Sequence, residues 1–108
     1  FKIIHCGDFQ TEGIDKIVDR IKKRVGNNAL YLSIDIDVLD PAFAPGTGTP
    51  EIAGMTTREI VNVIRGLSGM NLISADVVEV APAYDHAEVT SLAAATIVYE
   101  LTNLFAKK

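Results

Sequence analysis

Several residue types and patterns are scarce in this sequence, and each absence excludes a class of protein. Cys6 is the single cysteine, so no disulfide can form within the chain, and a reducing compartment is expected. No apolar run approaches the roughly 20 residues that span a bilayer. The net charge of −4 disfavours attraction to nucleic acid or to an anionic membrane. We therefore expect a cytoplasmic protein, or an organellar one whose targeting segment is not in this chain, without nucleic-acid or membrane partners.

The chain does contain enough apolar sequence for one globular unit. Of its 108 residues, 48% are hydrophobic and 22% are charged, which is typical of an apolar core with a charged surface. The length allows one domain at most. Phe1 opens directly onto an apolar run instead of a methionine or a polar lead-in, so we interpret the chain as a fragment. Cys6 is expected to be a small buried hydrophobe at the end of that run.

Strand-like and helix-like segments alternate along the chain. Short apolar runs predict strands at 1–6, 29–36 and 71–80. Apolar residues at helical spacing predict helices at about 12–25, 57–67 and 88–106, with loops at 7–13, 37–55 and 81–88. Thr56 and Glu59 match a capping box that starts the second helix, and the last helix is so apolar that we expect neighbours to cover it. This order predicts a parallel α/β sheet with helices on its faces, a three-layer arrangement.

Acidic side chains follow two of the predicted strands where each strand ends. Asp35 and Asp37 end the second strand, and Glu79 lies near the end of the third. Because the carboxyl ends of parallel strands meet at one edge of the sheet, we expect these three acids at the same rim. Adjacent carboxylates repel unless a cation lies between them, and oxygen ligands without thiolates favour Mg²⁺, Mn²⁺ or Ca²⁺. The alternative is that the aspartates cap turns, which we prefer for Asp40, directly before Pro41.

Asp-x-Asp alone is a weak motif, and other protein families use it. Haloacid-dehalogenase-like phosphatases also place it after an apolar strand, but there a Thr or Val usually follows where this sequence has Leu39. Nucleotide-sugar transferases use it with Mn²⁺, without further support here. The PGTGT stretch is followed by neither a Lys-Ser/Thr pair nor a helix start, so a phosphate-binding loop is not expected. Its backbone at 46–48 either approaches the site closely or forms a rigid surface turn.

The longer run SIDIDVLDPAFAPGTGTPEIAGMTTRE, at 33–59, is far more specific. It resembles the ureohydrolase family, which includes arginase and agmatinase, and whose last signature reads S-[FI]-D-[IV]-D-x-[LF]-D-P before a P-G-T-G-T-P-like loop. The segment ADVVEVAPAYDHAEVTSLAAATIVYE, at 75–100, looks like the closing strand and helix of the agmatinase branch. The resemblance is close over about 29–106 and looser over the first helix.

This resemblance implies an arginase-like fold, a three-layer parallel α/β sheet represented by its C-terminal β-α-β-α-β-α part over 1–108. It also implies two Mn²⁺ ions and hydrolysis of a linear guanidino compound, agmatine first, to urea and an amine. Asp35 would bridge the metals as a catalytic carboxylate, Asp37 would bind one metal, and Glu79 would pair with the substrate guanidinium. His86 is a candidate substrate contact near the pocket mouth, whereas His5 is expected to be structural.

The family's remaining ligands come from upstream G-G-D-H and D-A-H-x-D motifs, and neither occurs in this chain. The isolated chain is therefore expected to be inactive, and the full-length parent to be a homo-oligomer. Two alternatives stay open. The parent could act on guanidinobutyrate, arginine or another amidino compound, or, in a different class, the chain could have only a structural or assembly role.

Overall fold

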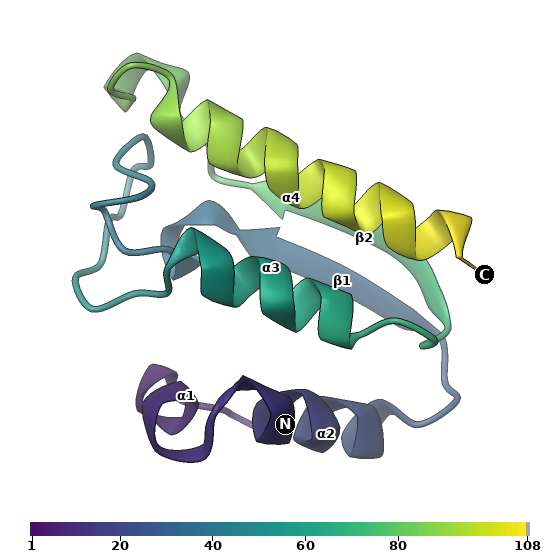
Figure 1. The fold of residues 1–108 in the computed structure, drawn as a ribbon. Coiled ribbons are helices and arrows are strands. Elements are labelled where there is room, and N and C mark those ends of the chain that lie inside the picture. The colour runs from purple at the N-terminus through teal and green to yellow at the C-terminus, as the bar shows by residue number, and fades with distance from the viewer. Residues whose placement is uncertain (108) are drawn as a thin grey trace.

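The computed structural model describes residues 1–107 as four helices and two strands (Figure 1). In chain order these are α1 (Cys6–Glu12), α2 (Ile14–Val25), β1 (Leu30–Asp35), α3 (Thr57–Gly66), β2 (Leu72–Val78) and α4 (Val89–Ala106). Short 3-10 turns follow the strands, at Ile36–Val38 after β1 and at Pro82–Tyr84 after β2.

β1 and β2 form a parallel pair, and α3 is the crossover helix that joins them. Pairing begins with Leu30 opposite Leu72 and, after one irregularity, ends with Asp35 opposite Val78. Both strands therefore end at the same edge of the sheet. The prediction of a parallel α/β sheet is confirmed.

One face of the sheet carries the helices (Figure 1). Leu32 and Ile34 of β1 face the helices, and Ile34 belongs to the buried core. Tyr31 and Ser33 alternate with them on the opposite face and are exposed, as the period of two along a strand requires. Of the three predicted layers, residues 1–107 thus contain the sheet and one layer of helices.

Branched apolar side chains from successive elements form the core. The largest fully buried ones are Ile17, Ile36, Leu39, Ile64 and Ile97. Burying one such side chain stabilises the fold by about 1.5–3 kcal/mol relative to leaving it exposed. The helices approach one another closely at Gly66, where a Cβ would lie 2.8 Å from Cγ2 of Val18. An alanine at this position would force the Val18 side chain or one of the two helices to shift.

The predicted start of the crossover helix is confirmed. The Glu59 amide donates to Oγ1 of Thr56 at 3.1 Å, and the Thr56 amide donates to Oε2 of Glu59 at 2.7 Å. These two bonds satisfy backbone donors that no helical carbonyl can reach. The helix ends at Gly66, within one residue of the predicted end.

The predicted first strand, 1–6, is wrong. Residues 1–5 have no regular structure, and α1 begins at Cys6, the last residue of the predicted strand, and runs through most of the segment predicted as a loop. An apolar run becomes a strand only beside a partner strand, and among residues 1–107 the sheet consists of β1 and β2. The helix starts where the His5 amide donates to Oδ2 of Asp8 at 3.1 Å, which is an N-terminal capping contact. Cys6 is exposed, not buried, and its Sγ lies 3.3 Å from the carbonyl oxygen of Ala53.

The last helix is less covered than its composition predicted. Within the described chain Leu92 is 63% exposed and Tyr99 is 65% exposed. By length and composition alone α4 could also cross a membrane, contrary to the expectation that no segment is long and apolar enough. The core helix of a soluble protein meets the same two criteria. The helix carries a charge: Glu100 is buried and accepts from Nη2 and Nε of Arg65 at 2.6 and 2.9 Å. These hydrogen bonds hold the pKa of the Glu100 carboxyl below its usual value.

Candidate functional site

Asp35 and Asp37 lie where β1 changes into a 3-10 turn. Asp35 is the last residue of the strand, and its Oδ1 accepts the amide of Asp37 at 3.1 Å. The two aspartates are therefore brought together by this turn, because Asp37 has already left the strand. Both are partly buried, so each carboxylate loses part of its hydration.

The long loop after β1 returns to the same point. The hydroxyl of Thr49 donates to Oδ2 of Asp37 at 2.9 Å. Thr47, two residues earlier, is 3% exposed, and its hydroxyl has no hydrogen-bond partner within the described chain. A buried hydroxyl without a partner costs free energy.

Neither Asp35 nor Asp37 has a cationic partner in the part of the chain that the structure describes. The ion pairs found there join Arg20 to Asp8 and Glu12, and Arg65 to Glu100. Two neighbouring carboxylates without a cation repel each other. Their oxygen donors fit a divalent cation such as Mn²⁺, but no group of three metal-ligating side chains occurs among residues 1–107.

Asp40 behaves as the predicted turn residue. Its Oδ1 accepts the amide of Ala42 at 2.8 Å, and its Oδ2 accepts the amide of Ala53 at 3.0 Å. Gly54 packs so tightly against this turn that a Cβ there would lie 2.5 Å from the Asp40 nitrogen. Both carboxylate oxygens are thus used to close the long loop, which distinguishes Asp40 from the two acids before it.

Glu79 lies at the same edge of the sheet but outside the aspartate pair. It follows Val78, which pairs with Asp35, and its backbone is left-handed, with φ of 66°. This conformation is uncommon for a residue with a side chain and costs about 1–3 kcal/mol. Its side chain is exposed, and it does not join Asp35 and Asp37 in a metal-binding group. The predicted common rim is present, whereas a three-acid cluster is not.

Both histidines are exposed and lie in different regions. His86 follows the 3-10 turn after β2, where its amide donates to Oδ1 of Asp85 at 2.9 Å. His5 precedes α1. Neither histidine belongs to a metal-ligating group in the described residues.

Asp76 forms a polar cluster that the sequence analysis did not identify. On the open face of the sheet, it accepts hydrogen bonds from the hydroxyls of Tyr31 and Ser33, the latter at 2.6 Å. The bond from Ser33, and then that from Tyr31, keep the pKa of the Asp76 carboxyl below its usual value. The signal was present in the sequence, because polar residues alternate with apolar ones in both strands.

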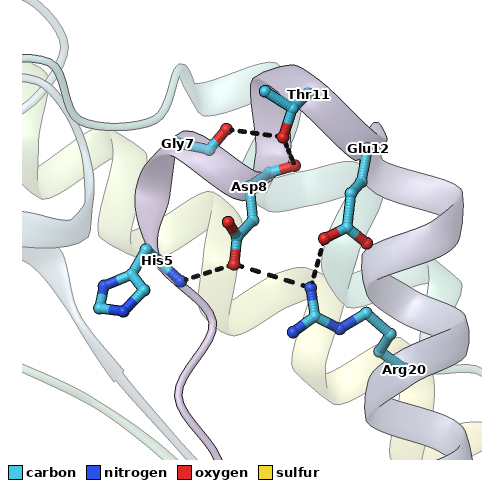
Figure 2. A network of polar contacts seen from close by, with 6 residues as sticks. All are labelled: His5, Gly7, Asp8, Thr11, Glu12 and Arg20. Atoms are coloured by element: carbon cyan, nitrogen blue, oxygen red, sulfur yellow. Dashed lines mark hydrogen bonds and ion pairs between the residues drawn. The ribbon is translucent and has the colours of Figure 1, made fainter.

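Another cluster of acidic residues lies near the N-terminus, between α1 and α2 (Figure 2). Nη1 of Arg20 lies 2.6 Å from Glu12 and 3.6 Å from Asp8. The hydroxyl of Thr11 bonds back to the carbonyls of its own helix. Figure 2 shows the His5 ring pointing away from this network. Here one guanidinium lies beside two acids, and the cluster joins two helices.

The sequence of residues 1–103 matches the model of the arginase family, described as "Arginase family". The chain belongs to the arginase family. The resemblance drawn from the SIDID and VVEVAPAYD segments is therefore confirmed at the level of the family.

Three relatives show how far this arginase-family chain is similar to characterised sequences and structures. A Schizosaccharomyces pombe protein with a provisional agmatinase name is 60% identical over 99% of this chain and 27% of its own length. An agmatinase of Enterobacter sp. strain 638 is 48% identical over the whole chain and 35% of its own length. The solved proclavaminate amidino hydrolase of Streptomyces clavuligerus is 40% identical, with a TM-score of 0.96 over 98% of this chain and 36% of that one.

The structural match confirms the arginase-like fold class for this arginase-family chain. The chain spans about a quarter to a third of the length of these relatives.

Proposed function

We propose that residues 1–108 are the C-terminal part of a single ureohydrolase domain, and that the longer protein uses Mn²⁺ to hydrolyse a linear guanidino compound, agmatine first. The observation that carries the proposal is the Asp35–Asp37 pair, which is held by local hydrogen bonds and has no cationic partner among residues 1–107. The agmatinase names of two relatives support the choice of substrate.

Asp35 and Asp37 would hold the metal. One oxygen of each is already engaged, Oδ1 of Asp35 by the Asp37 amide and Oδ2 of Asp37 by Thr49. The other oxygen of each accepts no hydrogen bond from the described chain, so these atoms are the available ligands. When bound, Mn²⁺ supplies Lewis-acid activation of water near neutral pH. Asp35, as the proposed bridging ligand, would be the catalytic carboxylate.

Glu79 would bind the guanidinium of the substrate. A carboxylate and a planar guanidinium form paired, charge-assisted hydrogen bonds that fix both position and orientation. The strand register places Glu79 one residue beyond the partner of Asp35. Its left-handed backbone is not extended, so the strand ends before it. His86, exposed on the following loop, would contact the substrate from the solvent side.

The proposal also includes the substrate class, the assembly and the location of the parent protein. The substrate is a small guanidino compound, and the parent protein is a cytoplasmic homo-oligomer without nucleic-acid or membrane partners. The isolated chain should be inactive, because among residues 1–107 only two acids are available at the metal position.

Urea release and bound Mn²⁺, measured on the full-length protein and on the 108-residue chain, test the proposal. We expect the full-length protein to release urea from agmatine in the presence of Mn²⁺ and the chain alone to release none. Metal-replete full-length protein without urea release from agmatine, guanidinobutyrate, arginine or the amidino derivative of proclavaminate would refute it, and would favour the structural or assembly role.

A second substrate class is favoured by one comparison. The 40% identity to proclavaminate amidino hydrolase supports an amidinohydrolase acting on a different linear guanidino compound, guanidinobutyrate included. Comparison of kcat/KM across these compounds decides between them, since each keeps the guanidinium and changes the remainder of the molecule.

A further inference from the structure

The loop that reaches Asp37 is fastened to the start of α4. The amide of Gly46 donates to Oγ1 of Thr90 at 2.8 Å, and the carbonyl of Gly46 accepts the amide of Ala81 at 2.8 Å. Thr90 is fully buried, at 0% exposure. A backbone amide buried beside this hydroxyl has no access to water, so loss of the bond leaves a donor unsatisfied.

Asp85 holds the other side of the same junction. Its Oδ1 accepts the amides of His86 and Thr90 at 2.9 and 3.0 Å, and its Oδ2 accepts the amide and hydroxyl of Ser91 at 3.0 and 3.2 Å. The formal N-cap of α4 is Glu88, which has left-handed backbone and makes no side-chain capping bond. Asp85 therefore caps the helix from three residues further back.

Gly46 and Asp85 are in direct contact. A Cβ on Gly46 would lie 2.8 Å from Cβ and 2.9 Å from Cγ of Asp85. The position tolerates no side chain, so the loop backbone can rest directly on the aspartate that caps α4. Burial of this carboxyl would raise its pKa, but the hydrogen bonds from Ser91, Thr90 and His86 outweigh it and leave the pKa well below the usual value.

Three residues beyond Gly46, the loop delivers its hydroxyl to the proposed metal ligand. Thr49 Oγ1 donates to Asp37 Oδ2 at 2.9 Å. A continuous path of hydrogen bonds and short backbone therefore runs from the first turn of α4 through Gly46 and Thr49 to Asp37. A hydrogen bond made to a metal ligand, such as the one from Thr49, orients that ligand and tunes its affinity for metal.

We infer that Thr90 and Asp85 are positioning residues for the metal ligand Asp37, acting through the loop at 45–50. The inference rests on the proposed function, because it takes Asp37 to be a ligand. A purely structural role would be different: Thr90 and Asp85 would then stabilise α4 and leave the affinity for metal unchanged.

Mn²⁺ titration of the metal-free full-length protein, followed by the paramagnetic resonance signal of free Mn²⁺, separates the two roles. Thr90→Val keeps the shape of the side chain and removes the acceptor of the Gly46 amide. We expect Kd for Mn²⁺ to rise by about 10-fold, the lower end of the range for partners bonded directly to a ligand, and Thr90→Ser, which keeps the hydroxyl, to restore most of the affinity.

Thr102→Val is the matched control. Its hydroxyl also lies on α4, is exposed, and donates only to the carbonyl of Val98 in the same helix at 2.9 Å. We expect no change in Mn²⁺ affinity. If Thr90→Val does not fold, as judged by circular dichroism, the isosteric Asp85→Asn takes its place, with the same direction of change expected.

Two results distinguish failure of the positioning role from failure of the proposed function. Wild-type Mn²⁺ affinity in a folded Thr90→Val or Asp85→Asn protein, together with lost affinity in Asp37→Asn, overturns the positioning role and leaves the proposed function intact. Wild-type affinity in Asp37→Asn itself overturns the proposed function.

Discussion

Two pairs of neighbouring acids, one between α1 and α2 and one at the end of β1, differ in whether a cationic side chain lies beside them. Asp8 and Glu12 share the guanidinium of Arg20 between α1 and α2 (Figure 2). Asp35 and Asp37, at the end of β1, accept hydrogen bonds from neutral donors and face no cation in the described residues. The first pair has a cation within this chain. The second has none among the described residues, and this difference is the physical basis for proposing a metal there.

The two pairs also differ in what holds them. The Arg20 contacts are partly exposed, with 42% of its side chain accessible, so water and salt weaken them. The aspartate pair is held by the turn after β1 and by Thr49, on a loop that hydrogen bonds of Asp40 and of Gly46 fasten in turn. Metal ligands are held in position by hydrogen bonds of the kind made to the aspartate pair, and less well by an exposed ion pair.

The largest expected effect comes from neutralising one acid in each pair. In the full-length protein, Asp35→Asn should lower urea release by on the order of 10³-fold, because several kcal/mol of metal-derived stabilisation of the transition state are lost. Asp8→Asn, measured in the same assay, should leave the rate within about twofold of the wild type, since exposed pairs contribute little. Equal rates for the two variants would remove the distinction between the pairs.

Glu79→Gln should have the next largest effect. The amide keeps the shape but loses the charge that pairs with a guanidinium, so we expect kcat/KM for the guanidino substrate to fall about 100-fold. The Mn²⁺ content should stay at the wild-type value, because Glu79 lies outside the aspartate pair. Loss of metal in this variant would instead assign Glu79 to the metal site.

Acid should reduce the stability that the Asp85 carboxylate contributes at the start of α4. The pKa of Asp85 is lower in the folded chain than in the unfolded chain, so its contribution to stability is complete above about pH 5, beyond the usual aspartate pKa of about 3.9. It is lost as pH falls towards the folded-state pKa. Urea unfolding between pH 2 and pH 6 should show this loss, and Asp85→Asn should make the same profile flatter. An unchanged slope in Asp85→Asn would mean that other acids govern it.

The smallest expected effect belongs to Arg20. Arg20→Met removes the cation of the N-terminal pair and should lower the free energy of unfolding by less than about 1 kcal/mol. The difference from the wild type should shrink further in 1 M salt, where the Debye length is about 3 Å. A larger, salt-independent loss would show that this network is not a surface ion pair.

The sequence predicted the elements whose signals are local. The alternation of apolar runs located β1, α3 and β2, and the Thr56–Glu59 spacing located the start of α3. Asp40 before Pro41 was predicted as a turn residue, and both of its oxygens accept backbone amides. In each of these cases the interacting groups lie on one short segment, or the required conformation depends on a single proline or capping residue.

The features that the sequence did not reveal depend on contacts between distant segments. The run at 1–6 was predicted as a strand, but it has no strand beside it in residues 1–107. Asp85 caps α4 only because Ala87 and Glu88 both adopt left-handed backbone and turn the chain back on itself. Asp76 finds Tyr31 and Ser33 only once the two strands pair. The number of residues between the partners of these contacts is not fixed by any local rule, so no sequence pattern predicts them.

Mn²⁺ binding by full-length Asp37→Asn, compared with Asp40→Asn, tests the metal assignment most directly. The two aspartates are three residues apart, yet one faces no cation and the other has both oxygens closed by backbone amides. We expect Asp37→Asn to lose at least one of two bound Mn²⁺ ions, with Asp40→Asn retaining both at reduced stability. Full Mn²⁺ occupancy in Asp37→Asn would contradict the assignment of this strand end as a metal site.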